Sequence, residues 1–139
     1  MADKKVLRVV GCLIKNNDSI LMLFRSQTET DPSLWGIPAG KVEKDEDDRE
    51  AVLREVLEET GIKLVNDSSL ELLGELPIEY PNLTVVFPVF GVKLESQPDV
   101  LLSPREHIDF AWMSAESILE LPNLMQDVDI IIEKFGRDF

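Results

Sequence analysis

Cysteine is nearly missing from this chain of 139 residues, in which Cys12 is the only one. A lone cysteine excludes an internal disulfide, and a reducing, cytoplasmic location is expected. Long apolar runs are missing too, because the N-terminal run VLRVVGCLI is too short to span a membrane and does not follow a signal-peptide pattern. Repeats and low-complexity linkers are not apparent, so we expect one domain over residues 1–139.

Positive charge is scarce. The chain has 14 Lys and Arg residues against 27 Asp and Glu residues, a formal net charge of -13. This field repels polyanions, so the expected partners include neither a nucleic-acid polymer nor a membrane. A small phosphorylated ligand can still bind where a cation screens the site. Hydrophobic residues make up 44% of the chain, which is enough to bury a core.

Stretches rich in β-branched and apolar residues predict that strands dominate the fold. The expected strands are 6–14, 19–26, a short irregular one within 34–42, 70–80, 83–95 and 107–113. Residues 15–18, KNND, supply a turn between the first two strands. The expected helices are 48–60, a short one from Ser114 that ends at Pro122, and an amphipathic one over 123–135 that ends at Gly136. This order indicates an α/β (α+β) fold, a mixed sheet with helices packed on it.

The helix over 48–60 has two distinct faces. Asp47 or Asp48 is placed to cap its start, and Gly61 to end it in a left-handed conformation. A helical wheel gathers an apolar stripe that is expected to face the core, formed by Val52, Leu53, Val56, Leu57 and Thr60. Another arc holds the acidic face, which we define as Glu55, Glu58 and Glu59.

Like charges at helical spacing repel each other, so the acidic face needs an explanation. One reading is a solvated surface on an acidic protein. The other is a site for a divalent metal ion, because Mg²⁺ and Mn²⁺ prefer carboxylate oxygens. A calcium-binding EF-hand loop is excluded, since DEDDRE lacks its glycine and its ligand spacing.

The spacing around the acidic face favours the metal site. Residues 40–62 follow the pattern G-x5-E-x7-R-E-U-x-E-E-x-G-U without deviation, where U is a bulky aliphatic residue. An accidental match is expected on the order of once in a million chains. The matching residues are Gly40, Glu46, Arg54, Glu55, Val56, Glu58, Glu59, Gly61 and Ile62.

This segment resembles the signature box of the Nudix hydrolases, in particular the mutator-type, MutT-like members. The order of strands and the terminal helix are similar to that family's α/β/α sandwich, a mixed sheet with helices on both faces, over nearly the whole chain. The lead-in LWGIPAGKVE resembles the family as well, except that Ala39 stands where a second glycine is common. The resemblance implies a hydrolase that cleaves a nucleoside diphosphate linked to another group, with Mg²⁺, or alternatively Mn²⁺, as cofactor.

The same resemblance assigns roles to the residues of the box. Glu55, Glu59 and the Gly40 carbonyl are the implied metal ligands, and Glu58 supports them directly or through water. Arg54 is expected to pair with Glu46 and to hold Glu55 in place.

Other implied roles lie outside the acidic face. Glu106 resembles the loop glutamate of mutator-type members and is the candidate general base, with Glu55 as the alternative. Arg25 and Lys41 are candidates for binding substrate phosphate. For His107, the only histidine, an incidental role is favoured.

The substrate is less well defined. Pro77 lies where many ADP-ribose pyrophosphatases have proline, whereas Tyr80 lies where many dinucleoside polyphosphate hydrolases have tyrosine. The short chain favours a nucleoside triphosphate, cleaved to monophosphate and pyrophosphate. Three alternatives remain, namely ADP-ribose, a dinucleoside polyphosphate, or a non-catalytic module that senses nucleotides. Apart from a small nucleotide, a second copy of the chain in a homodimer stays open as a partner.

Overall fold

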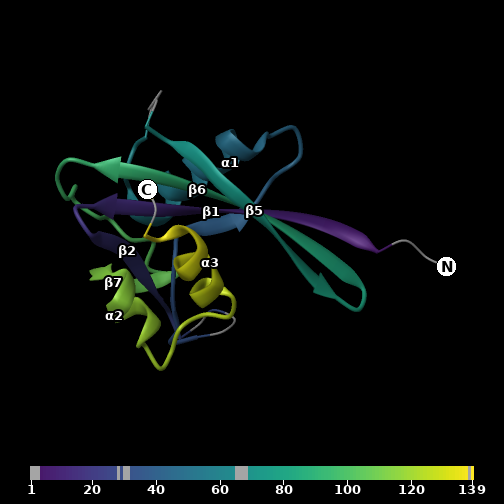
Figure 1. The fold of residues 1–139 in the computed structure, drawn as a ribbon. Coiled ribbons are helices and arrows are strands. Elements are labelled where there is room, and N and C mark those ends of the chain that lie inside the picture. Colours follow the sequence, from purple (N-terminus) through teal and green to yellow (C-terminus); the bar gives the residue numbers. More distant parts are fainter. Residues whose placement is uncertain (1–3, 28, 30–31, 65–68, 138) are drawn as a thin grey trace.

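The computed structural model describes residues 4–27, 29, 32–64, 69–137 and 139, and these form a mixed β-sheet with helices on both faces (Figure 1). The strands are β1 (Lys5–Asn16), β2 (Ser19–Arg25), β3 (Trp35–Gly36), β4 (Ala39–Lys41), β5 (Glu71–Tyr80), β6 (Leu83–Leu94) and β7 (His107–Ser114). The helices are α1 (Asp48–Thr60), α2 (Ala115–Leu119) and α3 (Val128–Phe135). The predicted fold class is therefore confirmed. Within the described ranges, no helix is long and apolar enough to cross a membrane.

The sheet has two parts that meet at the turn between β1 and β2. β1 runs parallel to β6 and antiparallel to β4, and β5 pairs with β6 at the edge. β2 pairs with β3 and β7. β1 and β2 pair with each other only next to their turn, at Lys15–Ile20 and Asn16–Ser19. The two strands then diverge, which leaves room for the start of β4 and for side chains between the two parts.

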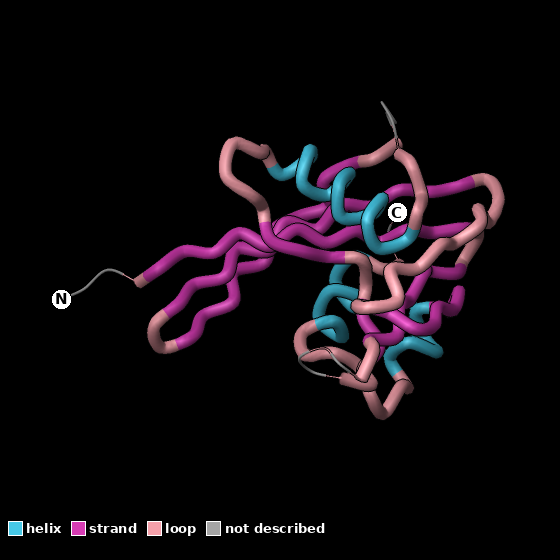
Figure 2. Tube along the Cα trace, turned by 180° about the vertical axis from the view of Figure 1, so that it is seen from behind, coloured by secondary structure: helices cyan, strands magenta, loops and turns pink. Residues whose placement is uncertain are grey.

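Alternation along the strands divides the core into two layers, since successive side chains point to opposite faces of a sheet. On β1, Cys12 and Ile14 face the layer under α1, whereas Leu13 faces the layer under α2 and α3. The opposite placement of α1 and α3 is visible from the two sides of the molecule (Figures 1 and 2). Fully buried aliphatic side chains fill both layers, so the sheet between them is a rigid support.

One end of the sheet extends beyond the body. The first residues of β1 pair with the start of β6, at Lys5–Leu83 and Val6–Thr84, and the β5–β6 hairpin continues with them. Figure 2 shows these strands as an arm that projects to the side of the N-terminus. The base of the arm lies beside α3, and residues of both line a cavity.

Residues close in the sequence determine where α1 begins and ends. Asp47 caps its start by accepting a hydrogen bond from the Glu50 N–H, and the Glu50 side chain accepts one from the Asp47 N–H. Gly61 ends the helix with φ of 73°, a left-handed conformation that suits glycine. The predicted start and end are confirmed, but the prediction for Leu57 was wrong, because this residue is 46% exposed. It lies at the margin of the apolar stripe, where the core does not cover it.

The C-terminal helix is shorter than predicted. It was expected from residue 123, but α3 begins at Val128. The preceding residues instead extend the sheet, because the Trp35 N–H donates to the Asn123 carbonyl and the Met125 N–H donates to the Trp35 carbonyl. Asp127 follows with φ of 71° and turns the chain into the helix. Backbone pairing with β3 therefore overrides the helical period of this stretch.

Candidate active site

The helix α1 and the strand β4 approach each other closely at Gly40. A Cβ added at Gly40 would overlap the carboxyl group of Glu55, so any other residue here requires this carboxyl group or the helix to shift. Since the φ of Gly40 is not positive, close approach is the reason for glycine here, not an unusual backbone conformation. The loop and the acidic face thereby form one continuous surface.

Arg54 ties this surface together. Its guanidinium donates to both carboxylate oxygens of Glu46 at 2.8 and 3.0 Å and to Glu55 Oε1 at 2.6 Å. It also donates to the Lys41 carbonyl at 3.0 Å, which links α1 to β4. The hydrogen bonds from Arg54 lower the pKa of the Glu46 carboxyl group to about 2. The structure therefore contains the expected Arg54–Glu46 pair, and the same guanidinium fixes the orientation of Glu55.

Glu59 lies deeper than the rest of the acidic face. The residue is 4% exposed, and its Oε1 accepts a hydrogen bond of 2.9 Å from the Ala39 N–H. Burial raises the pKa of Glu59 to about 9, and the negative charges of Glu55 and Glu106 add to this effect. Burial also raises the pKa of Glu55, although its hydrogen bond to Arg54 acts in the opposite direction.

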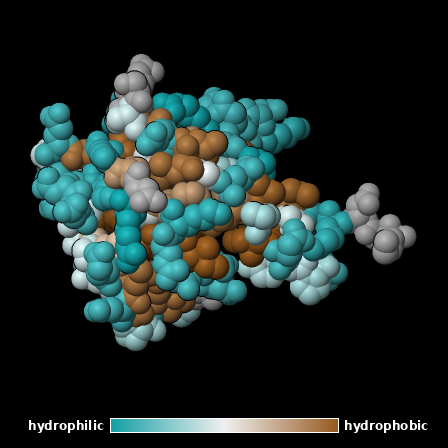
Figure 3. Space-filling model, in the orientation of Figure 1, coloured by the Kyte–Doolittle hydropathy of each residue, from teal (hydrophilic) through white to brown (hydrophobic). Residues whose placement is uncertain are grey.

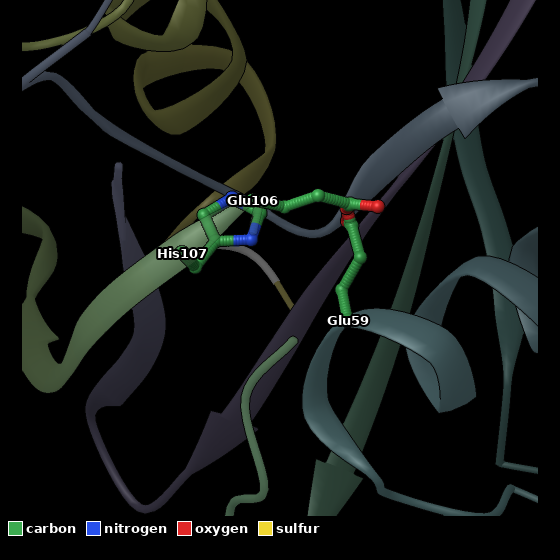
Figure 4. Close-up of side chains that lie close together, drawn as sticks. All are labelled: Glu59, Glu106 and His107. Atoms are coloured by element: carbon green, nitrogen blue, oxygen red, sulfur yellow. The ribbon is translucent and has the colours of Figure 1, made fainter. Parts of the chain in front are cut away.

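The pairing of β2 with β7 brings a distant loop to these carboxylates. His107 pairs with Arg25, and the Ser26 N–H donates to the Glu106 carbonyl at 2.9 Å. As a result, Glu59, Glu106 and His107 each place a potential ligand atom within 4.8 Å of the others. Figure 4 shows the ends of the two glutamate side chains side by side, with the imidazole ring next to them. We call these three residues the Glu59–Glu106–His107 cluster.

His107 is as deeply buried as Glu59, and both are less exposed than Glu106. The residue is 4% exposed, and its Nδ1 has no hydrogen-bond partner among the described residues. Burial and then the charge of Arg25 lower the pKa of His107 to about 4. At neutral pH the ring is uncharged, so one of its nitrogens carries a free lone pair.

The remaining predicted site residues lie around this centre. The Arg25 side chain is 18% exposed and lies 3.4 Å from Glu29. The Glu58 side chain is 55% exposed at the rim, 3.3 Å from Arg54. Lys41 is exposed on β4. The structure thus brings Glu55, Glu59 and Glu106 together and leaves Glu58 and Lys41 at the margin.

An apolar cavity of about 210 Å³ opens beside the cluster. Its walls come from the base of the arm and from the segment that leads into α3, and apolar surface gathers between α3 and the arm in Figure 3. Its polar lining includes Arg25, Glu59, His107, Gln126 and Asp127. Its apolar lining includes Val9, Ile37, Ile78, Tyr80, Val85, Phe87, Met125, Val128 and Ile131.

The donor set suits a divalent metal ion. Carboxylates, a backbone carbonyl and an imidazole are all ligands for such ions. Glu59 is buried beside two other carboxylates, so a bound cation would stabilise its charged form, and Gly40 lets the Glu55 carboxyl lie directly against the loop. The residues present therefore fit a metal ion.

Comparison with known proteins identifies the family. Residues 5–135 match the NUDIX domain. The chain belongs to the Nudix family. It is similar to the MutT protein from Methanosarcina mazei Go1, with a TM-score of 0.82 and 34% identity, over 99% of this chain and 97% of that chain.

Two further relatives have more specific descriptions. The CTP pyrophosphohydrolase of Escherichia coli (strain K12) is 29% identical over 129 residues, which cover 91% of this chain and 90% of the relative. A bifunctional NMN adenylyltransferase/ADP ribose pyrophosphatase from Francisella tularensis, in complex with AMP and a Mn ion, is 26% identical with a TM-score of 0.75. That match covers 96% of this chain and 42% of the other. The chain is thus a Nudix hydrolase acting on phosphoric anhydride bonds, as the sequence predicted.

Sequence reasoning missed two parts of this Nudix site. His107 was interpreted as incidental, but the structure places it in the cluster. The cavity was not predicted, because its lining residues come from separate segments that range from Val9 to Ile131. The available signal for His107 was its position directly after Glu106 and at the first position of a strand.

Proposed function

We propose that this Nudix hydrolase is a Mg²⁺-dependent pyrophosphohydrolase that converts a nucleoside triphosphate to a nucleoside monophosphate and pyrophosphate. One observation carries the proposal, namely that the apolar cavity of about 210 Å³ shares two residues, Glu59 and His107, with the Glu59–Glu106–His107 cluster. A ligand that bridges the two places needs an apolar, planar end and an anionic, metal-binding end. A nucleotide has both.

The size of the cavity supports a nucleoside with a simple phosphate chain. Pockets that enclose a drug-sized ligand measure about 300–1,000 Å³. The smaller cavity here suits a base, while the sugar and phosphates extend toward the acidic face. The similarity to a CTP pyrophosphohydrolase over 91% of the chain agrees with a triphosphate substrate.

In this proposal the acidic face holds the metal. Glu55, Glu59 and the Gly40 carbonyl are the ligands, and Glu58 at the rim supports them through water. When bound, the ion neutralises phosphate charge and lowers the pKa of bound water. Arg54 keeps Glu55 oriented toward the loop through its hydrogen bonds to Glu46 and Lys41.

Glu106 is assigned the role of general base. Its carboxylate takes a proton from the attacking water, whose oxygen forms the new bond to phosphorus. The bond from that phosphorus to the bridging oxygen between the α- and β-phosphates breaks, and pyrophosphate and monophosphate leave. Arg25 lies beside the cavity and Lys41 lies at the rim, where their positive charges are available to the phosphate oxygens.

ADP-ribose and dinucleoside polyphosphates are the competing substrates. Tyr80 lines the cavity, which is compatible with stacking on a base in any of the three classes. A second nucleoside or a terminal ribose must then lie outside the cavity on the protein surface, so these substrates gain fewer contacts.

A substrate screen tests the proposal. The purified chain is incubated with Mg²⁺ and each of four classes: nucleoside triphosphates, ADP-ribose, nucleotide sugars and dinucleoside polyphosphates. Products are identified by ³¹P nuclear magnetic resonance. We expect the highest kcat/KM for a nucleoside triphosphate, with pyrophosphate as product. A higher kcat/KM for ADP-ribose, or release of single phosphate from the triphosphate, would overturn the assignment.

A further inference from the structure

The orphaned nitrogen of His107 is the feature that the metal ligands assigned above leave unexplained. The residue is 4% exposed, and its Nδ1 has no hydrogen-bond partner in the described part of the chain. A buried polar atom without a partner is costly, and most such atoms are satisfied in native proteins. An unpartnered ring nitrogen inside a functional cleft therefore indicates that something binds there.

The surroundings of His107 indicate what that partner is. Its ligand atom lies within 4.8 Å of carboxylate oxygens of Glu59 and Glu106. Two carboxyl groups and an imidazole nitrogen offer little to an apolar group. They attract a cation, and a divalent ion has the charge to compensate both carboxylates.

We propose that His107 is a nitrogen ligand to a divalent metal ion that it shares with Glu59, with the candidate base Glu106 beside this ion. The inference rests on the proposed metal dependence and adds a ligand of different chemistry to it. Mg²⁺ prefers an all-oxygen shell, whereas imidazole is a ligand of first-row transition ions. His107 therefore biases this position toward a transition ion over Mg²⁺, while the oxygen ligands on Glu55 and Gly40 do not, and paramagnetic Mn²⁺ is the probe for the test.

The rival explanation is a core histidine that only fills space. Such a residue should sit among apolar neighbours and have its ring nitrogens bonded to backbone groups or water. His107 instead lies at the edge of the cavity with Arg25 and Glu59, and Figure 4 shows its ring beside the two carboxylate ends. The geometry favours His107 as a metal ligand over His107 as a core-packing residue.

The composition of the chain makes the test direct, because His107 is the only histidine. The chain is produced without a histidine tag, with natural or ¹⁵N-labelled histidine, and is loaded with Mn²⁺. Pulsed electron paramagnetic resonance then measures the nuclei coupled to the bound ion. We expect a coupled ¹⁴N nucleus that changes to ¹⁵N in the labelled protein, since no other residue carries the label.

Two variants extend the test to affinity. His107→Asn keeps an oxygen three bonds from Cα, as Nδ1 is, whereas His107→Leu removes the donor and keeps the bulk. Loss of groups that support a metal commonly lowers affinity by about 10–100-fold. We expect a fall of at least about tenfold in Mn²⁺ affinity for the Leu variant. We expect the Asn variant to bind Mg²⁺ almost normally but to lose its preference for Mn²⁺.

The outcomes are distinguishable. Bound Mn²⁺ without any coupling to the labelled nitrogen overturns the role of His107 and leaves the proposed function intact. Absence of Mn²⁺ binding to the natural chain likewise overturns the role of His107, and absence of both Mn²⁺ and Mg²⁺ binding overturns the proposed function as well. The labelling experiment uses the unaltered chain, so it remains decisive even if neither variant folds.

Discussion

Glu59 carries its carboxyl group inside the protein, with 4% of the residue exposed and a hydrogen bond from the Ala39 N–H. Its pKa of about 9 means that the metal-free folded protein holds a proton there at neutral pH. A bound cation reverses this preference, so metal binding should release a proton. A proton and a metal ion therefore compete for the Glu59 carboxyl group.

The variant Glu59→Gln tests both states of this residue. With metal, we expect turnover to fall by at least about a hundredfold, because a charged ligand is lost while the shape is kept. A steady-state assay with saturating Mg²⁺ measures this. Near-normal turnover would show that Glu59 is not a ligand.

Without metal, the same variant should be more stable than the natural chain. Between the unfolded pKa of 4.5 and the folded pKa of about 9, the folded protein binds a proton that the unfolded chain does not. The free energy of unfolding of the natural chain therefore falls as pH rises through this window, whereas glutamine has no such dependence.

Thermal unfolding in chelator measures this difference. Each pH unit above 4.5 removes up to about 1.4 kcal/mol from the stability of the natural chain, so we expect a Tm for Glu59→Gln that is higher by about 10 °C or more near pH 8, with little difference near pH 5. A difference that grows toward low pH would contradict the raised pKa.

Glu106 is the residue whose role depends most on the fold. Glu106→Gln should lower turnover by roughly a hundredfold, the usual worth of general-base help, and leave thermal unfolding nearly unchanged. The loss should shrink toward about pH 10, where hydroxide replaces the missing base. The exposed Glu95, changed to Gln, is the matched control. Parallel pH profiles of equal height for Glu106→Gln and the natural chain would move the base to Glu55.

At the scale of elements, the site depends on the contact between α1 and β4. Gly40 lies under Glu55, and Arg54 bonds the Lys41 carbonyl from above. These contacts hold the acidic helix at one distance from the loop. A change that separates the two elements should disturb metal binding more than folding, because β4 is three residues long and pairs only with β1 among the described strands.

Gly40→Ala makes that separation. The added methyl group overlaps the carboxyl of Glu55, so the helix or the side chain must move. Misplacement of about 1 Å is enough to cost about a hundredfold in rate. We expect such a loss in turnover together with weaker Mg²⁺ binding by calorimetry.

The cap variant Asp47→Ala is the control for this experiment. It should cost about 1 kcal/mol of stability through the lost hydrogen bond to the Glu50 N–H, with turnover nearly unchanged. If Gly40→Ala lost stability like the cap variant but kept its turnover, the close approach would be structural only.

Elements that are set by local contacts could be predicted from the sequence. The start of α1 at Asp48 and its end before Gly61 follow from a capping box and a left-handed glycine, both within a few residues. The start of α3 could not be predicted, because Leu124 bridges to Trp35, a partner far away in the chain. The prediction that Leu57 faces the core was wrong for a similar reason, since a helical wheel cannot show where the core ends.

At the scale of the whole molecule, the site is assembled from segments that the sequence keeps apart. The box residues share one loop and one helix, so their pattern could be recognised. Glu106 and His107 reach Glu59 only because β7 pairs with β2 at Arg25–His107. That pairing depends on long-range register, and the cavity depends on the same arrangement, so neither could be derived from local signals.

Under the proposed function, the charge of the whole chain makes a metal ion necessary for activity. A protein with a formal net charge of -13 would then bind a polyphosphate next to Glu55, Glu59 and Glu106. Cations therefore have to stand between the two sets of negative groups. Compact octahedral ions suit the rigid helix, and larger Ca²⁺ should substitute poorly.

The most direct measurement is turnover of a nucleoside triphosphate by the natural chain after chelation and after each metal is restored. We expect no turnover in chelator, full recovery with Mg²⁺ or Mn²⁺ and little recovery with Ca²⁺, with monophosphate and pyrophosphate as the products. Full activity in the chelator would contradict the account.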